Sequence, residues 1–342
     1  MTVRKPMKSR KNERGAVLLT TLLLMTVMAG LAVAIMDDIR FSVNRAVGVQ
    51  NAAQADWYMR GGEAFAENWL NSLNSPNSNV ADNQAGFAQI VLAQQPIVFP
   101  FGEGQDVDSG DLGIVVSDGR NCFNVNQLAN SKTNKITRGL LADLLTFLQF
   151  DTLQAESFAA SIQDWVDGDI IPEQGGAEDL TYTAKNPPYH AANTLMMDIT
   201  ELRAIEGITE DIYVRMQPFL CASADMKANK INLNTLHPEQ WPLLAILFDR
   251  DEGEDDEEVQ VAKAVIAQRP LAGYETVGAV WALPVVADLE LRGAGQDMTD
   301  VKTDLVNLEI IVRRGEQTRR QQASFSLSGE AGARLLSRRG AY

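Results

Sequence analysis

The first apolar stretch of the chain is long and uncharged. Residues 16–36 carry no charged side chain, and about 21 helical residues are enough to span a bilayer. Beyond Met36, apolar residues recur at mixed three- and four-residue steps as far as Leu73, without a proline. That spacing is typical of an amphipathic helix. The pattern predicts one helix from about residue 16 to about residue 73, which "NSPNSN" then ends.

Strand-like alternation appears in two places that lie far apart in the chain. The run "LGIVVSDGRNCFNVNQL" predicts a short strand, a turn at Asp118-Gly119 and a second extended piece. The run "TDLVNLEIIVRRGEQTRRQQASFSLSG" predicts an antiparallel hairpin that turns at about Gly315–Thr318. Helical spacing dominates between them, from about Lys135 to Gln268. The simplest architecture is therefore a helical domain inserted into an α/β domain.

The charge of the chain is divided unevenly. Residues 1–15 hold six Lys or Arg and one Glu, whereas the whole chain carries −15. The basic leader predicts that the N-terminus stays in the cytoplasm and that everything after Met36 lies outside. The remainder, at about −20, includes the run "DRDEGEDDEEVQ" with eight acidic residues. Such a surface is a poor partner for nucleic acid, which binds basic surfaces.

Catalytic and zinc-binding motifs are missing from the sequence. There is no G-x-S-x-G and no phosphate loop, and neither His190 nor His237 sits in a recognisable site. We therefore expect no enzyme. The only cysteines, Cys122 and Cys221, indicate one disulfide if the chain is exported to an oxidising compartment. The alternative is two buried free thiols.

The leader has two interpretations. A secretory signal peptide would be removed near the small residues Ala32–Ala34. A cut after Gly15, on the cytoplasmic side, would instead leave the apolar helix on the mature protein, beginning at Ala16, as in type IV pilins and pseudopilins. The length of the apolar segment and its continuity with the following helix favour the second interpretation. A generic membrane-anchored periplasmic scaffold would not need Gly15 at that place.

Several motifs together carry a family resemblance. The leader, "SDGRNCFNVNQL", "QDWVDGDIIPEQGGAEDLTY", "PPYHAANTLMMDITEL" and "INLNTL" occur in the order expected for the protein K family of large minor pseudopilins of type II secretion, which this chain resembles. The segment beginning at "INLNTL" also resembles a helix–hairpin–helix or SAM-like pair, so a nucleic-acid-binding protein is the alternative function. The acidic run beside that segment argues against DNA.

The resemblance implies an α+β fold, in which a pilin-like N-terminal helix packs on a small antiparallel sheet that carries a large, all-helical, SAM-like insertion. The implied divisions are a prepilin leader at 1–15, a transmembrane segment at 16–36, a pseudopilin α/β domain at 74–134 and 270–342, and an inserted helical domain at 135–269. The protein would be a single-pass protein of the inner membrane with its globular part in the periplasm.

The resemblance also implies a role and a set of partners. The chain would start the pseudopilus at its tip, together with minor pseudopilins of types I and J, and so support export across the outer membrane. The major pseudopilin, secreted proteins and the secretin are further expected partners. Prepilin peptidase would cut between Gly15 and Ala16, and the new amine of Ala16 would then be methylated.

Thr20 stands at the fifth position of the expected mature chain. Most pilin-like proteins carry Glu there, whose carboxylate can pair with the N-terminal ammonium of a neighbouring subunit. An unpaired charge in lipid is costly, so such a pair helps to bring subunits into register. Thr20 cannot supply that charge. A subunit without it suits the first position of a filament.

The acidic segment "DWVDGDIIPEQGGAED" is a candidate calcium site. Six carboxylates lie within sixteen residues, and a hard cation such as Ca²⁺ takes six to eight oxygen ligands from such sets. The match to an EF-hand fails where Ile171 and Pro172 replace a ligand and the glycine. The family that the chain resembles binds calcium in the inserted domain. The alternative is a plain acidic loop. The expected ligands are Asp167, Asp169, Glu178, Asp179 and Asp198.

Overall fold

The structure is a computed structural model that describes residues 13–73, 80–102, 109–224, 230–248, 257–286, 295–315, 317–327 and 332–341. The chain divides into two compact units, Met1–Arg60 and Gly61–Tyr342. Three segments with an expected role lie wholly or partly outside the described residues. They are the basic leader up to residue 12, the helix terminator at 74–79 and the acidic residues 249–256.

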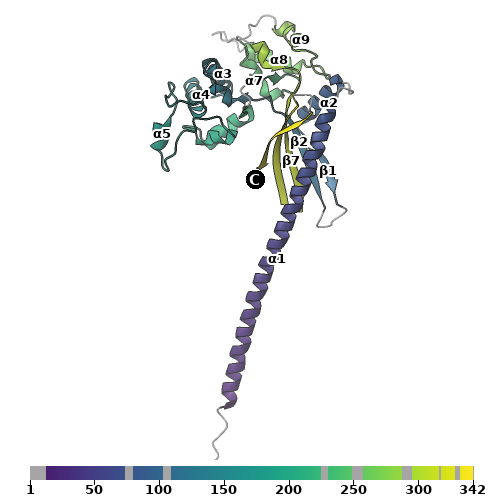
Figure 1. The fold of residues 1–342 in the computed structure, drawn as a ribbon, viewed down its shortest axis with the longest axis vertical. Helices are drawn as coiled ribbons and strands as arrows, with labels where there is room; N and C mark the ends of the chain where they lie inside the picture. The colour runs from purple at the N-terminus through teal and green to yellow at the C-terminus, as the bar shows by residue number, and fades with distance from the viewer. Residues whose placement is uncertain are drawn as a thin grey trace, which may run out of the picture. The chain divides into compact units, whose positions relative to one another are not determined.

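The helix α1 (Glu13–Leu73) is continuous, as the hydrophobic pattern predicts. In the first unit its large apolar side chains face outward, and those between Val17 and Val49 are 48% to 71% exposed. The hydroxyls of Thr20, Thr21 and Thr26 each donate to a carbonyl three residues earlier, so these polar groups are satisfied within the helix itself. By length and composition this helix is able to cross a membrane (Figure 1).

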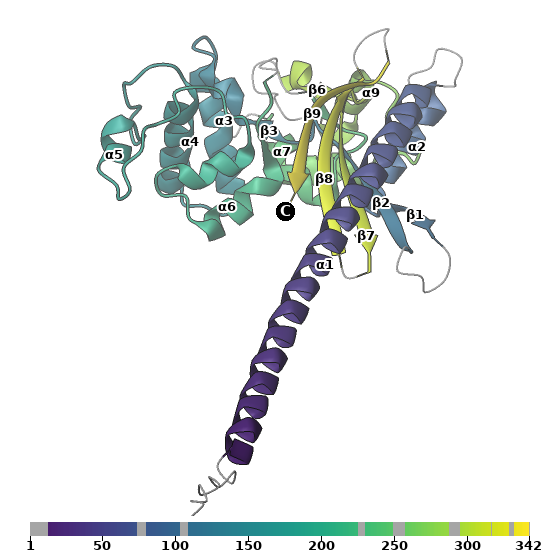
Figure 2. The ribbon, with the colours of Figure 1, turned by 60° about the horizontal axis from the view of Figure 1, so that its bottom comes forward.

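A five-stranded antiparallel sheet forms in the second unit (Figure 2). Its strands, in spatial order, are β1 (Ile97–Phe101), β2 (Gly110–Asp118), β7 (Leu305–Arg314), β8 (Gln317–Ser326) and β9 (Arg334–Ala341). The hairpin β7–β8 is confirmed, with Gly315 at its turn in the left-handed region (φ 54°). The pattern did not predict β1 or β9, the two edge strands. Pro100 suits β1, because an edge strand tolerates a missing N–H.

One face of the sheet packs against the C-terminal part of α1 and against α2 (Val80–Ala93). Ala66 and Leu70 from α1 and Phe87 from α2 are buried with strand residues such as Leu308 and Phe325. Gly62 allows the close approach, since a Cβ there would lie 3.1 Å from the methyl groups of a leucine on β2. The sheet and these two helices therefore enclose one hydrophobic core.

A second core lies in the helical part of this unit. Its helices are α3 (Asn134–Phe147), α4 (Thr152–Val166), α5 (Asp179–Thr183), α6 (Glu210–Met216), α7 (Trp241–Ala245), α8 (Glu257–Ala267) and α9 (Val277–Trp281). Short 3₁₀ turns stand at Val125–Ala129, Ile199–Ala204, Gln217–Phe219, Pro238–Gln240, Pro284–Val286 and Gly295–Met298. Two pairs of two-residue strands run parallel, β3 (Phe123–Asn124) with β4 (Leu220–Cys221) and β5 (Ile231–Asn232) with β6 (Thr299–Asp300). The α+β fold class is confirmed.

Buried polar side chains join the end of β2 to the helical part. The carboxylate of Asp118 accepts hydrogen bonds from Asn232 (2.8 Å) and from the hydroxyl of Thr235 (2.7 Å). Asn121 donates to the same hydroxyl (3.0 Å) and accepts from the backbone of Asn232 (2.9 Å). These bonds satisfy groups that burial would otherwise penalise. They also give a structural role to Asn121 of the motif "SDGRN" and to Asn232 of the motif "INLNT".

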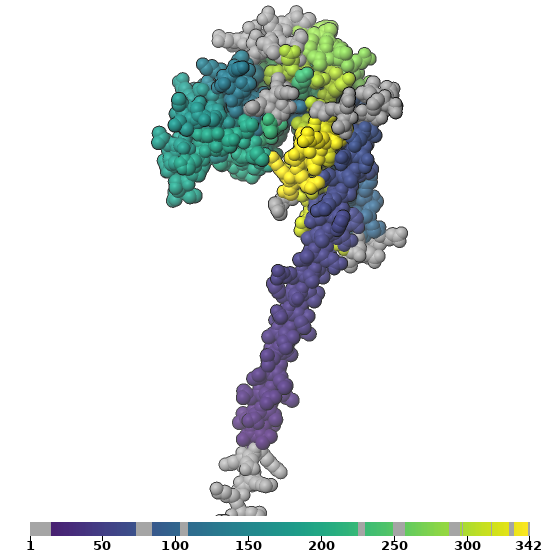
Figure 3. Space-filling view, viewed as in Figure 1, coloured from purple at the N-terminus to yellow at the C-terminus, as the bar shows by residue number. Residues whose placement is uncertain are grey.

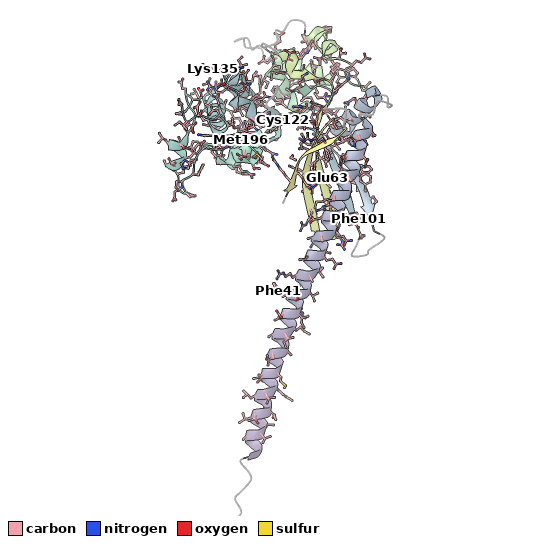
Figure 4. The ribbon with its side chains drawn as sticks, in the orientation of Figure 1. Phe41, Glu63, Phe101, Cys122, Lys135 and Met196 are labelled. Atoms are coloured by element: carbon pink, nitrogen blue, oxygen red, sulfur yellow. A yellow bond between two sulfur atoms is a disulfide. The ribbon has the colours of Figure 1, made fainter. Side chains whose placement is uncertain are left out.

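A disulfide closes the helical part beside β3 and β4. Cys122 and Cys221 are bonded, with their Cα atoms 5.7 Å apart. The chain holds only these two cysteines. The structure therefore favours the disulfide over two buried free thiols. Figure 4 shows Cys122 beside the strands and Met196 within the helical part.

The domain divisions stay predictions, but the cores bear on them. The five-stranded sheet contains strands that precede the helical part in the sequence and strands that follow it, as an insertion requires. The helical core, however, continues past residue 269 and includes Tyr274, Val280 and Val301. These three residues therefore pack with the helical part, although the expected division assigned them to the α/β domain.

Candidate functional site

Three carboxylates meet where α4 ends and α5 begins. Asp167 is the residue at the C-terminal boundary of α4, Asp169 follows in the loop, and Glu178 caps the start of α5. One oxygen from each of the three lies within 4.8 Å of the others. The sequence expectation placed all three in one site, and the structure brings them together.

Buried oxygens without a hydrogen-bond donor mark this cluster. Oδ1 of Asp167, Oε1 of Glu178 and Oδ1 of Asn193 are buried and accept no hydrogen bond. Glu178 is only 4% exposed. A buried acceptor left without a donor costs about 1–3 kcal/mol, so three of them are a considerable penalty. A cation among them would remove it.

Asn193 is a further candidate ligand that the sequence analysis missed. Its Nδ2 donates to the backbone oxygen of Asp169 (3.0 Å), which leaves its Oδ1 as the free acceptor. Its backbone lies in the left-handed region (φ 44°), which Asn adopts more readily than most residues. The only signal for it in the sequence was its place in the motif "PPYHAAN". Nothing in that motif distinguishes a ligand from a turn residue.

The electrostatics of the cluster favour a hard cation. Burial raises the pKa of the Glu178 carboxyl, and the charges of Asp167 and Asp179 act in the same direction. Burial also raises the pKa of Asp167, with the charge of Asp169 adding to it. All candidate ligand atoms are oxygens, the type that Ca²⁺ and Mg²⁺ prefer. The donor set therefore fits calcium.

A buried carboxyl lies behind the cluster and shapes its loop. Asp164 is fully buried and accepts from the backbone N–H of Glu173 (3.1 Å). A Cβ at Gly176 would lie 2.0 Å from its Oδ2, so only glycine fits there. Burial raises the pKa of Asp164 to about 7, and the charges of Asp167 and Glu178 contribute. Asp164 thus positions the loop that carries Glu178.

Two expected ligands are not in this cluster. The carboxylate of Asp179 contacts Nδ1 of His190 (3.0 Å) and accepts from the backbone of Ala191 (2.9 Å). The carboxylate of Asp198 caps the 3₁₀ turn that follows it and pairs with Arg339 on β9. Among the described residues the three-carboxylate group comprises Asp167, Asp169 and Glu178. The other two acids already have partners, which their sequence proximity did not reveal.

The expected cleavage site lies at the start of the described part of α1. Gly15 and Ala16 are exposed and helical. Thr20 is also exposed, and its hydroxyl donates to the carbonyl of Val17 (2.9 Å). At the expected fifth position of the mature chain, this helix therefore presents a neutral side chain whose hydroxyl is already hydrogen-bonded.

Comparisons with known proteins give one consistent result. The family described as "Type II secretion system (T2SS), protein K" matches residues 121–225 and again residues 231–302. Type II secretion system protein K of Pectobacterium carotovorum subsp. carotovorum is 30% identical over 330 residues, which cover 94% of each chain. Its counterpart from Klebsiella pneumoniae is 30% identical over 290 residues, covering 82% of this chain and 83% of that one.

A solved structure resembles this chain as well. It is the crystal structure of the GspK–GspI–GspJ complex from the enterotoxigenic Escherichia coli type 2 secretion system. The TM-score is 0.71 at 25% identity, and the match covers 87% of this chain and 99% of the other. These findings agree with the pseudopilin interpretation rather than with a nucleic-acid binder or a generic scaffold. Because the family matches more than half of the chain and a relative is aligned over almost all of it, this chain belongs to the type II secretion system protein K family and is a minor pseudopilin of type II secretion.

Proposed function

We propose that this protein is the tip subunit of the pseudopilus, which it starts together with the other minor pseudopilins to support export across the outer membrane. The observation that carries the proposal is the exposed apolar face of α1, which has Thr20 where an acidic residue would serve subunit recruitment. Before assembly the helix anchors the chain in the inner membrane, with the rest of the protein in the periplasm. After assembly the same apolar face packs among the helices of neighbouring subunits.

Processing exposes the end of this helix. Prepilin peptidase cuts between Gly15 and Ala16, and the amine of Ala16 is then methylated. Gly15 and Ala16 are both exposed, so a peptidase can reach the bond between them. The positively charged mature amine pairs with a carboxylate of a subunit below. Thr20 offers no carboxylate to a subunit above, since its hydroxyl is neutral and bonded to its own helix.

The partners follow from the family. The related GspK was solved in a complex with GspI and GspJ, so we place the corresponding minor pseudopilins beside this chain. The major pseudopilin continues the filament below them. Exported proteins and the secretin meet the tip. The disulfide Cys122–Cys221 supports a location in the oxidising periplasm.

The test is to co-express the full chain with prepilin peptidase and the other minor pseudopilins. Mass spectrometry should find a mature N-terminus at methylated Ala16, and the minor pseudopilins should co-purify. Immunogold labelling of the chain should mark one end of each pseudopilus. A mature chain that begins near Ile35, or label spread along the filament shaft, would contradict the proposal.

The acidic cluster is proposed as a calcium site of this subunit. Asp167, Asp169, Glu178 and Asn193 would hold the ion, and the three unpaired buried oxygens support this assignment. Bound calcium would neutralise the mutual repulsion of the carboxylates and hold the loop between α4 and α5 to the helical core. Its role is therefore structural.

Isothermal calorimetry on the full chain tests the ligand set. Glu178→Gln should weaken calcium binding by about tenfold or more, because it removes a buried anionic ligand. Asp179→Asn is the matched control, since its carboxylate contacts His190 instead, and it should change the affinity by less than about threefold. No calcium heat from the wild-type chain, or equal losses in the two variants, would show that the assignment is wrong.

A further inference from the structure

Two neighbouring arginines of the C-terminal strand β9 contact different parts of the protein. Arg339 pairs with the carboxylate of Asp198 and donates to the backbone oxygen of Met197, both in the helical part. Arg338 pairs with Glu63 on the C-terminal part of α1. In the space-filling view the yellow C-terminal residues lie between the teal helical part and the blue C-terminal part of α1 (Figure 3). β9 therefore links the helical part to α1.

The helical side of this link is one short turn. Asp198 caps the 3₁₀ turn Ile199–Ala204. Oε1 of Glu201 accepts from the backbone N–H of Met197 (2.8 Å) and from that of Asp198 (3.1 Å), which completes a capping box. We call residues 197–204 the capping turn. Its own hydrogen bonds hold both groups that the arginine of β9 contacts.

The other oxygen of Glu201 reaches the helix that leads into the acidic cluster. Oε2 of Glu201 accepts from Nε1 of Trp165 on α4 (3.4 Å). Trp165 is 6% exposed and lies two residues before Asp167. Its ring also packs against the ring of Tyr182 on α5, with the centroids 5.3 Å apart and the planes at 81°. Trp165 therefore joins the capping turn to both helices that flank the cluster.

A cation in the cluster would fix the position of this tryptophan. Asp167 lies at the end of α4 and Glu178 at the start of α5, and one oxygen of each lies within 4.8 Å of the other. An ion that binds both carboxylates sets the spacing of the two helices. Trp165 and Tyr182 lie on these helices, so the ion also orders their ring contact. The bond from Trp165 to Glu201 is longer than most N–H···O bonds, so it depends most on where the indole lies.

β9 is the element that is able to respond. It is an edge strand of the described sheet and lies close to the C-terminus. Its pairing with β8 shifts register between Ser324 and Phe325. Edge segments near chain ends open at a lower free energy than central strands. β9 therefore has a docked state and an open state, and the contacts of Arg339 with the capping turn stabilise the docked state.

We propose that calcium bound at the acidic cluster stabilises the docked state of β9 through Trp165, Glu201 and Arg339. The inference rests on the calcium site proposed above. Binding free energies are reciprocal, so docking of β9 strengthens calcium binding by the same factor by which calcium strengthens docking. Because β9 also pairs with Glu63 of α1, the attachment of the helical part to the sheet and to α1 then depends on the calcium of the compartment.

Hydrogen exchange of the full chain in phosphatidylcholine nanodiscs, read by mass spectrometry, tests this coupling. Calcium should slow exchange of the backbone amides of residues 334–341 by about fivefold, within the usual range of coupling between two sites. A chelator should reverse the effect. β1 (Ile97–Phe101) is the internal control, because it is the opposite edge strand of the same sheet, and its exchange should not respond to calcium.

Two variants interrupt the series of contacts at different places. Trp165→Phe keeps an aromatic ring beside Tyr182 but removes the indole N–H. Arg339→Met keeps the aliphatic length and removes the ion pair on a different element from the cluster. Each should abolish the response of β9 to calcium and weaken calcium binding in calorimetry by about fivefold. Arg334→Met, at an exposed position of the same strand, is the matched control and should change neither quantity.

The opposing outcomes are distinct. Calcium heat with unchanged exchange of β9 would overturn the coupling and leave the calcium site intact. Absence of calcium heat from the wild-type chain would overturn both. If Arg339→Met binds calcium as tightly as the wild type, or if its β9 exchanges faster by the same factor with and without calcium, the arginine has a structural role only and the proposal is wrong.

Discussion

Removing Arg338 should destabilise the protein more than neutralising its partner Glu63. Glu63 lies in the C-terminal part of α1 with its side chain 9% exposed, whereas the side chain of Arg338 on β9 is 49% exposed. Two nitrogens of Arg338 contact the carboxylate, and Gln321 donates to it from β8 (3.1 Å). Figure 4 shows Glu63 where α1 passes the strands. Arg338 can turn into water when it loses its partner, but Glu63 cannot.

The asymmetry in exposure sets the magnitudes. Arg338→Met keeps the aliphatic length and leaves a buried carboxylate with one neutral donor. Breaking a fully buried pair costs about 3–5 kcal/mol, and partial exposure of Arg338 reduces the expected loss to about 2–3 kcal/mol. Glu63→Gln leaves no buried charge and should cost about 1 kcal/mol. The double variant Glu63→Met with Arg338→Met should lose less than the sum of the single changes.

Urea unfolding of the full chain in nanodiscs, followed by pulse proteolysis, measures these free energies. Arg334→Met is the matched control, because Arg334 is exposed on the same strand, and it should change the free energy of unfolding by less than about 0.5 kcal/mol. If Arg338→Met costs no more than Glu63→Gln, the reasoning from burial is refuted.

Three further changes test other parts of the structure. Burial raises the pKa of Asp164 to about 7. The stability that the protonated Asp164 contributes to the calcium-free protein is therefore fully present below about pH 4 and is lost as pH rises to about 7. Urea unfolding at several pH values should show that the free energy of unfolding of Asp164→Asn varies less with pH than that of the wild type, and an equal pH dependence in the two proteins would contradict the raised pKa. The double variant Cys122→Ser with Cys221→Ser opens a loop with a sequence separation of 99. Chemical denaturation should show that the free energy of unfolding falls by about 4 kcal/mol. A fall of less than about 1 kcal/mol would contradict a stabilising role for the disulfide. Gly62→Val should destabilise the protein by about 1–3 kcal/mol more than Gly61→Val. Of these two glycines, only Gly62 has neighbours within 4 Å of an added Cβ. Thermal melting should therefore give a lower melting temperature for Gly62→Val, and equal melting temperatures would argue against close packing of α1 on the sheet at Gly62.

Local patterns predicted the elements whose contacts are local. The bounds of α1 followed from uncharged and amphipathic spacing, which a helix needs in lipid and against a core. The hairpin β7–β8 followed from two alternating runs joined by a glycine. Both are stabilised by hydrogen bonds between residues near in sequence, so one window of sequence contains the necessary information.

Pairings between distant segments could not be read in the same way. β2 pairs with β7, although the whole helical part lies between these two strands in the sequence. β9 pairs with β8 and forms an edge of the sheet. The weak pattern of β9 becomes a strand because β8 offers it a row of unpaired backbone groups. The core past residue 269 likewise depends on which surfaces meet.

The candidate metal site shows the same difference between what residues close in sequence determine and what contacts between distant segments determine. The sequence alone determined the long apolar helix with Thr20 near its start, the hairpin, the family and the acidic segment, because each is a pattern of residues close together in the chain. Only the tertiary structure decided that the side chain of Asn193 bonds to the backbone of Asp169, while Asp179 and Asp198 contact His190 and Arg339. The physical reason is that a carboxylate binds whichever cation or donor the fold brings within reach, and the distance along the chain does not specify that neighbour.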